Sequence, residues 1–221
     1  MAVFHPRVED LPGEFPVFPL PGALLLPRGK LPLNIFEPRY LAMTEDALGQ
    51  GRMFGMIQPD PILPETDTGP GLFHVGCLGR LSSFSETDDG RYLITLTGVI
   101  RFAIASEVPM RRGYRRVRGE CTPYLADLAL EERPIGVGRD TVLAALRGYF
   151  THRGFDANWD AIRRLPDDML VSTLSMVCPF EPAEKQALLE APSDADRAAT
   201  LLALLQMGAM APDSPGGRSV S

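Results

Sequence analysis

The stretch from Pro16 to Pro59 constrains the fold of this chain most strongly, because its apolar residues change period at a definite point. Two short apolar runs, broken by prolines, are typical of strands. From Tyr40 onward the apolar residues recur at helical spacing, which predicts an amphipathic helix. Pro38 suits the first turn of that helix, where its missing N–H costs nothing, and Gly49 suits its end. With a buried strand over 53–57, the predicted order is strand, loop, strand, helix, strand.

The next segment predicts a loop followed by a long hairpin. PDPILPETDTGPG, which follows Gln58, is rich in proline, glycine and acids and therefore favours irregular backbone. Residues 73–86 and 91–104 are typical of two long strands, joined by a turn over Thr87–Gly90 in which Gly90 supplies a positive φ. On the second strand we expect one face to carry Tyr92, Ile94 and Leu96 and the other Leu93, Thr95 and Thr97.

Glycines within these strands predict that the sheet bends. Gly76, Gly79 and Gly98 interrupt otherwise apolar strands, as bulges or sharp bends do where a sheet closes into a barrel. A further strand is expected over 114–124. The first part of the chain is therefore predicted to be mostly β, with one helix.

After Ala126 the sequence changes character and predicts helices. The boundaries expected from this shift are a flexible arm over 1–14, the β part over 15–125, a link over 126–139, a small helical bundle over 140–208 and a disordered tail over 209–221. The last helix should open on a capping box formed by Ser193 and Asp196 and stop at Gly208. The fold class is therefore α+β. The apolar stripes that indicate the helices are Val142, Leu146, Tyr149 and Phe150; Leu170, Leu174 and Val177; Leu188 and Leu189; and Ala198, Leu201, Leu202 and Leu205.

Several motifs in this order resemble the N-terminal substrate-binding domain of Lon proteases, and in particular its stand-alone bacterial members. They are Pro16-Val17-Phe18-Pro19-Leu20, Pro27, Pro32-Leu33, Phe36-Glu37-Pro38-Arg39-Tyr40, Val75-Gly76-Cys77-Leu78-Gly79 and Leu96-Thr97-Gly98-Val99-Ile100-Arg101-Phe102. The resemblance covers residues 15–124 well and the helical part more loosely. It implies a PUA-like β-barrel that binds exposed or unfolded protein segments, in protein quality control or as a proteolysis adaptor.

The residues that Lon uses for catalysis have no counterpart in this sequence. A phosphate loop needs a glycine five positions before the glycine of its Gly-Lys pair, but Leu24 occupies that position relative to Gly29-Lys30. A Ser–Lys peptidase dyad needs a desolvated lysine, and we expect both Lys30 and Lys185 to be solvated. The sequence therefore predicts a protein that is not an enzyme.

Neither histidines nor cysteines predict a metal site or another cofactor. His5, His74 and His152 show no ligand-pair spacing. The odd set Cys77, Cys121 and Cys178 is expected to consist of reduced thiols. We therefore expect no metal and no cofactor.

Two candidate surfaces remain. Leu24, Leu25 and Leu26 are consecutive, so a strand would not point all three to one side. Either at least one of them stays exposed and contacts a protein partner beside Pro27, or all three turn inward against the helical part. Arg39 either pairs with Glu37 at the helix start or faces a groove and binds a peptide carbonyl or carboxylate.

The second surface is a basic cluster that suggests an alternative, RNA-binding function. Basic residues around an aromatic are typical of nucleic-acid contacts, and PUA-like folds often bind RNA. Charges on an edge strand also block sheet-to-sheet aggregation, and this interpretation suits an acidic chain of net charge −6 better. RNA is therefore the less favoured partner. The cluster comprises Arg111, Arg112, Tyr114, Arg115, Arg116 and Arg118.

The sequence also bears on the compartment and the partners. The N-terminal residues lack a basic region followed by an apolar run, and no apolar stretch approaches the roughly 20 residues of a membrane-spanning helix. We therefore expect a cytoplasmic protein with no membrane association. Its expected partners are unfolded or exposed protein segments, with a protease or chaperone as a further candidate.

Overall fold

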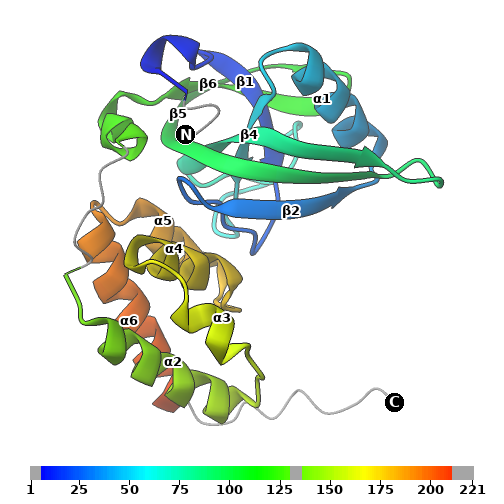
Figure 1. Ribbon diagram of the computed structural model, residues 1–221. Helices are drawn as coiled ribbons and strands as arrows, with labels where there is room; N and C mark the ends of the chain where they lie inside the picture. Colours follow the sequence, from blue (N-terminus) through cyan, green and yellow to red (C-terminus); the bar gives the residue numbers. More distant parts are fainter. Residues whose placement is uncertain (1–5, 130–135, 211–221) are drawn as a thin grey trace. The chain divides into compact units, whose positions relative to one another are not determined.

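The computed structural model describes residues 6–129 and 136–210 of the chain (Figure 1). The chain divides into two compact units. The first comprises Met1–Glu132 and Ser172–Glu190, and the second comprises Arg133–Val171 and Ala191–Ser221. The prediction placed all of 140–208 in one helical bundle, whereas the structure assigns 172–190 to the unit that contains the sheet.

Residues 6–129 of the first unit hold a six-stranded sheet and one α-helix, in the predicted order. The helix is α1 (Pro38–Gly49), with proline in its first turn. Short 3-10 turns, η1 (Val8–Asp10) and η2 (Thr122–Leu128), lie before and after the strands. The strands are β1 (Glu14–Pro19), β2 (Lys30–Ile35), β3 (Met53–Ile57), β4 (Val75–Glu86), β5 (Tyr92–Arg111) and β6 (Tyr114–Glu120).

Strand pairing forms a cycle. β5 pairs with β4, β4 with β3, β3 with β1, β1 with β6, and β6 again with β5. Only β1 and β3 run parallel, and β2 pairs with β5 alongside the cycle. β5 pairs with three strands because it is long. Its first half pairs with β2 and β4, and its second half pairs with β6.

The core of this unit is packed around two phenylalanine rings. Phe15 and Phe102 meet edge to face at 4.8 Å between ring centroids, and both are buried. Glycines face the rings from neighbouring strands: a Cβ at Gly76 would lie 2.5 Å from Cζ of Phe102, and one at Gly119 would collide with Phe15. Because any side chain there would displace a ring, glycine is required for this close approach.

The long hairpin confirms the period-2 prediction. Gly90 has φ of 78° in the turn between β4 and β5. Ile94 and Leu96 are buried while Leu93 is exposed, as the alternation predicts. The register between β4 and β5 shifts at Leu78/Gly79, beside one of the predicted bends.

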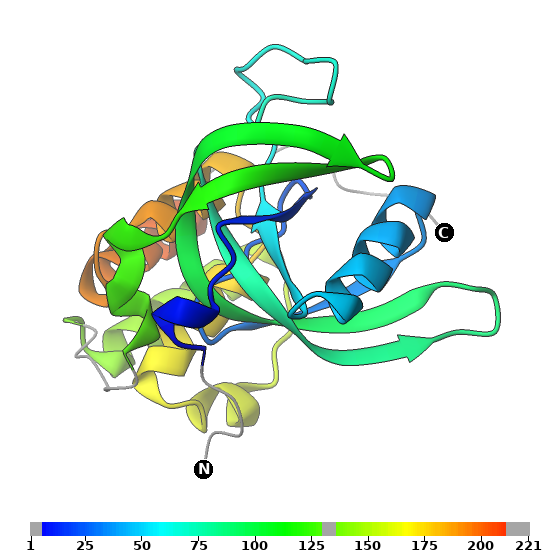
Figure 2. The ribbon, with the colours of Figure 1, turned by 90° about the horizontal axis from the view of Figure 1, so that it is seen from above.

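The arginine-rich segment is not one strand. β5 extends to Arg111, and a tight turn with positive φ at Arg112 (47°) and Gly113 (85°) leads into β6. β6 then ends at Glu120 instead of Tyr124, since the chain enters η2. Figure 2 shows the two hairpins, β4–β5 and β5–β6, with α1 between them.

Helix α5 (Pro182–Glu190) belongs to the first unit because buried polar side chains attach it there. Gln58 Nε2, at the end of β3, donates to the Pro182 carbonyl (3.0 Å) and to Gln186 Oε1 (3.1 Å). Lys185 Nζ donates to the carbonyls of Gly22 (2.7 Å) and Met176 (3.2 Å). The prediction that Lys185 is solvated was therefore wrong: this side chain is buried, and burial lowers its pKa.

The second unit is helical. It contains α2 (Arg139–Arg153), α3 (Trp159–Arg163) and α6 (Asp194–Met210), while α4 (Asp167–Val177) crosses the boundary between the units. α2 packs along α6, and Val142, Leu146, Leu201 and Leu205 are buried as the stripes predict.

The structure confirms the predicted start of the last helix but differs from the prediction in other details of the helical part. The Ser193 hydroxyl accepts the Asp196 N–H at 3.1 Å, which confirms the cap of α6. The predicted stop at Gly208 was wrong, because α6 continues to Met210 and Gly208 instead lies under the Tyr149 ring. Val177 is exposed although the stripe predicted it buried, and α3 was not predicted.

Other expectations fall partly outside the described residues. The predicted arm over 1–14 includes η1 and the first residue of β1, and its residues 1–5 lie outside. Within the predicted link, η2 reaches Leu128 and 130–135 lie outside, as does 211–221 of the predicted tail. Within the described ranges, no helix combines the length and apolar character needed to cross a membrane.

Candidate functional site

The three consecutive leucines are buried, so of the two alternatives the one that leaves a leucine exposed is wrong. Leu24, Leu25 and Leu26 are 2%, 1% and 0% exposed. The loop turns them inward without being a strand or a helix: Arg28 N–H donates to the Gly98 carbonyl (2.8 Å), and a Cβ at Gly79 would lie 2.7 Å from Leu25 Cδ2. Leu25 therefore packs against β4, the backbone of Leu26 lies beside Gly98 of β5, and Pro27 is partly buried.

Arg39 forms the predicted ion pair with Glu37 and also lines a cavity, while peptide binding by this side chain stays a prediction. Its Nε and Nη2 donate to Glu37 Oε2 at 3.0 and 2.8 Å, so the predicted ion pair at the start of α1 is present. Its guanidinium also lies 4.6 Å from the ring centroid of Tyr40, and the side chain is about half exposed. Arg39 thus borders a cavity while held in place by Glu37.

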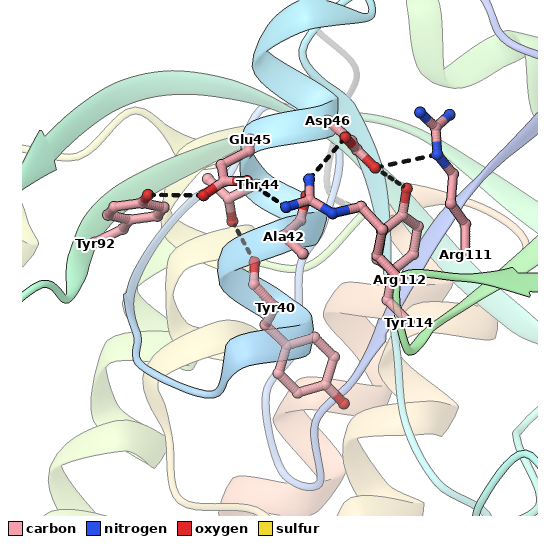
Figure 3. A network of polar contacts seen from close by, with 9 residues as sticks. All are labelled: Tyr40, Ala42, Thr44, Glu45, Asp46, Tyr92, Arg111, Arg112 and Tyr114. Atoms are coloured by element: carbon pink, nitrogen blue, oxygen red, sulfur yellow. Dashed lines mark hydrogen bonds and ion pairs between the residues drawn. The ribbon is translucent and has the colours of Figure 1, made fainter.

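The arginines at the β5–β6 turn contact the acidic face of α1 (Figure 3). Arg112 binds Glu45 at 2.7 Å and Asp46 at 3.0 Å, and Arg111 binds Asp46 at 3.3 Å. Tyr114 Oη donates to the same Asp46 carboxylate at 2.6 Å. Burial and this hydrogen bond raise the pKa of Tyr114 to about 12, while the bond from Tyr114 lowers the pKa of Asp46.

From the opposite side, the β4–β5 hairpin reaches the same helix. Tyr92 Oη donates to Glu45 Oε1 at 3.2 Å. Glu45 and Asp46 therefore connect α1 to both hairpins (Figure 3), and Figure 2 shows the helix lying between these hairpins.

The remaining arginines of the cluster are also paired. Arg115 is buried against Glu107, and Arg116 and Arg118 bind Glu14 at 3.3 and 2.7 Å. The expectation of an edge strand was wrong as well, because β6 pairs with both β1 and β5. Five arginines thus face four carboxylates, and the cluster is not an uncompensated basic patch.

A cavity of about 250 Å³ lies beside Arg39. Its walls combine proline and tyrosine rings with two guanidinium groups. The lining includes Pro19, Pro59, Pro70, Arg39, Tyr40, Tyr114 and Arg115.

A larger cavity, of about 600 Å³, lies on the other side of the 59–72 loop and shares Arg115 with the smaller one. Its apolar lining includes residues of the loop and of β5, and three of its polar lining residues carry carboxylates. Arg115 Nη1 donates to the Pro70 carbonyl at 2.6 Å, so this side chain fixes the loop between the two cavities. The lining includes Asp60, Leu63, Leu72, Ile104, Glu107 and Glu190.

The 59–72 loop is ordered by its own hydrogen bonds and presents apolar side chains. Asp60 N–H donates to the Gly71 carbonyl (2.9 Å), and Thr66 exchanges two backbone bonds with Gly69. Ile62 is nevertheless 89% exposed and Leu63 48% exposed. The composition of this loop predicted only irregular backbone. Its two adjacent apolar residues, Ile62 and Leu63, could have indicated a binding surface.

The arrangement of a mixed sheet with one packed helix and a helical C-terminal part is found in solved structures of Lon N-terminal domains. The crystal structure of a Lon N-terminal domain protein from Xanthomonas campestris matches with a TM-score of 0.58 and 21% identity, covering 86% of this chain and 97% of that one. The N-terminal domain of a Mycobacterium avium complex Lon protease matches with a TM-score of 0.52 and 18% identity, covering 87% and 97%. At these identities the match establishes the fold.

The family model of the ATP-dependent protease La (LON) substrate-binding domain matches residues 14–207. The chain therefore belongs to this family, as the motifs predicted. Lon protease 2 of Sorangium cellulosum is 30% identical over 125 residues, and the Lon protease of Anaeromyxobacter dehalogenans is 25% identical over 112. These matches cover 56% and 51% of this chain but only 15% and 13% of those proteases.

Proposed function

We propose that this chain is a non-catalytic module that binds exposed or unfolded segments of other proteins, and that it does so around the 59–72 loop. In this proposal it delivers such segments to a protease or chaperone as an adaptor in protein quality control. We also assign its cyclic strand pairing to a small PUA-like barrel. Membership of a substrate-binding family supports the first part of the proposal, and the pairing of β5 with both β4 and β6 supports the barrel.

One observation supports the proposed location of the site: two exposed apolar side chains lie beside a cavity whose lining is partly apolar. Ile62 and Leu63 follow each other in a hydrogen-bonded loop, and Leu63 also lines the 600 Å³ cavity. Exposed apolar groups next to a concave surface are typical of binding sites, and cavities of this size hold several side chains. The loop is already ordered, so binding costs little conformational entropy.

Binding of a permanently unfolded protein tests this proposal. Reduced, carboxymethylated α-lactalbumin should bind the wild-type chain, and the Ile62→Ser/Leu63→Ser variant should bind it at least about tenfold more weakly. Thermal unfolding of the variant should stay close to wild type, because exposed positions contribute little to stability.

The matched control changes a second pair of exposed apolar residues on the β4–β5 hairpin. Phe84→Ser/Leu93→Ser likewise removes two exposed apolar side chains, without altering the lining of either cavity. Equal loss of binding in both double variants would contradict the proposed location. Absence of binding by the wild-type chain would contradict the function itself.

A further inference from the structure

The larger cavity combines an apolar wall with two carboxylates, those of Asp60 and Glu190, for which the described residues provide no ion-pair partner. Leu63, Leu72 and Ile104 supply apolar lining from the loop and from β5. Asp60 and Glu190 stand in the same lining, one from the loop and one from the end of α5. A ligand in this cavity would therefore meet apolar surface and negative charge together.

The contacts of these two carboxylates leave their charge uncompensated. Asp60 Oδ1 accepts the Ile62 N–H at 2.9 Å, and Glu190 Oε1 accepts Gln186 Nε2 at 2.7 Å. Within 6–129 and 136–210, neither carboxylate forms an ion pair with arginine or lysine. Neutral hydrogen bonds orient these groups without cancelling their charge.

The other carboxylate of the cavity, that of Glu107, adds no further uncompensated charge. Glu107 is neutralised by Arg115, whose three donors go to Glu107 and to the Pro70 carbonyl. His74 lines the cavity and is exposed. The negative charges that remain in the lining are those of Asp60 and Glu190.

We infer that the segments bound here carry a lysine or arginine next to apolar residues. This inference rests on the proposed function and specifies the chemistry of its ligand. A long basic side chain can lay its methylene stem along Leu72 and Ile104 while its charged end reaches a carboxylate. An acidic segment would instead bring a like charge into a partly desolvated space, which disfavours its binding.

Three fluorescein-labelled peptides of equal length test the preference by anisotropy. Each has flanks of serine and glycine and a core of Leu-Lys-Leu, Leu-Ser-Leu or Leu-Glu-Leu. We expect the lysine peptide to bind about tenfold more tightly than the serine peptide, and the glutamate peptide to bind more weakly than both. The difference should shrink in about 0.5 M salt, because salt screens partly exposed charges.

Two double variants with the same change in net charge locate the effect. Asp60→Asn/Glu190→Gln keeps both acceptor oxygens and should abolish the preference for lysine. Glu65→Gln/Asp67→Asn changes two exposed acids of the same loop that do not line the cavity, and should keep the preference.

Each outcome decides the inference. Equal binding of the three peptides to the wild-type chain would overturn the basic preference and leave the proposed function standing. Loss of the preference in both double variants would show that it comes from overall charge and not from this cavity. If none of the peptides binds, and the unfolded protein does not bind either, both proposals fail.

Discussion

At the scale of single residues, the polar contacts of this protein are mostly compensated pairs that connect elements. Asp46 shows this most clearly, since Arg111, Arg112 and Tyr114 all converge on it from the β5–β6 hairpin (Figure 3). Tyr114 is buried, while both arginines are about half exposed. The hydrogen bond from Tyr114 is therefore expected to contribute more to stability than the exposed ion pairs.

This bond predicts a pH-dependent stability. The pKa of Tyr114 is raised to about 12, so its neutral form stabilises the fold below the unfolded value near 10, and this contribution is lost as pH rises from 10 toward 12. The pKa of Asp46 is lowered, so its contribution is present above its unfolded value and is lost as pH falls below it. Tyr114→Phe should cost about 1–2 kcal/mol at pH 7.

Urea unfolding at pH 7, 9 and 11 measures the effect. The difference in unfolding free energy between wild type and Tyr114→Phe should narrow by roughly 1 kcal/mol between pH 9 and 11, allowing for partial solvent screening. A difference that stays constant over this range would contradict a neutral Tyr114 bound to Asp46.

At the scale of elements, two glycines in facing helices have opposite environments. Gly208 in α6 lies under the Tyr149 ring of α2, so a Cβ there would collide with the ring. Gly148 in α2 is open by comparison, since a Cβ there would lie 3.8 Å from Ala209. Helix propensity alone would predict the same benefit from alanine at both positions.

The two alanine variants should therefore change stability in opposite directions. Gly208→Ala should destabilise the second unit by about 1–3 kcal/mol, because the tyrosine must move out of a packed position. Gly148→Ala should stabilise it by up to about 1 kcal/mol. Thermal unfolding followed by circular dichroism checks both, and a stabilising Gly208→Ala would show that the ring does not occupy this place.

At the scale of the whole molecule, α5 is separated in sequence from the sheet with which it forms a compact unit. Arg101 on β5 is central to this arrangement: its Nε and Nη2 bind both oxygens of Asp127 at 2.8 and 2.9 Å, and its Nη1 donates to the Leu189 carbonyl at 3.1 Å. Arg101 and Asp127 are both buried, so removing one of them leaves a buried charge.

Hydrogen exchange of an Asp127→Ala variant tests this division into units. The change should cost about 3–5 kcal/mol in the first unit, because Arg101 loses its buried carboxylate. Amides of η2 and α5 should exchange faster, while those of α2 and α6 keep their protection. Equal acceleration in α2 and α6 would contradict two separately packed units.

The local pattern of the sequence was sufficient to predict most of the secondary structure. Period 2 in β5, period 3.6 in α1 and α6, the turn at Gly90 and the cap at Ser193 all depend on residues within a few positions of each other. The motifs between Pro16 and Phe102 were likewise sufficient to predict the family to which the chain belongs, and the match of the family model over 14–207 confirms this prediction.

The burial of particular side chains and the pairing of particular charges were decided only by the tertiary structure, because they depend on groups far apart in the chain. Leu25 is buried because it meets Gly79, Arg112 is compensated because it meets Asp46, 66 positions away, and Lys185 is desolvated because it meets Gly22, 163 positions away. The sequence pattern around each residue carries no trace of such a partner. By itself the sequence therefore determined which segments form strands and helices, whereas the folded chain decided which charges are compensated and which leucines are covered. The physical reason is that burial and electrostatics depend on distance in space, whereas propensity and periodicity depend on distance along the chain.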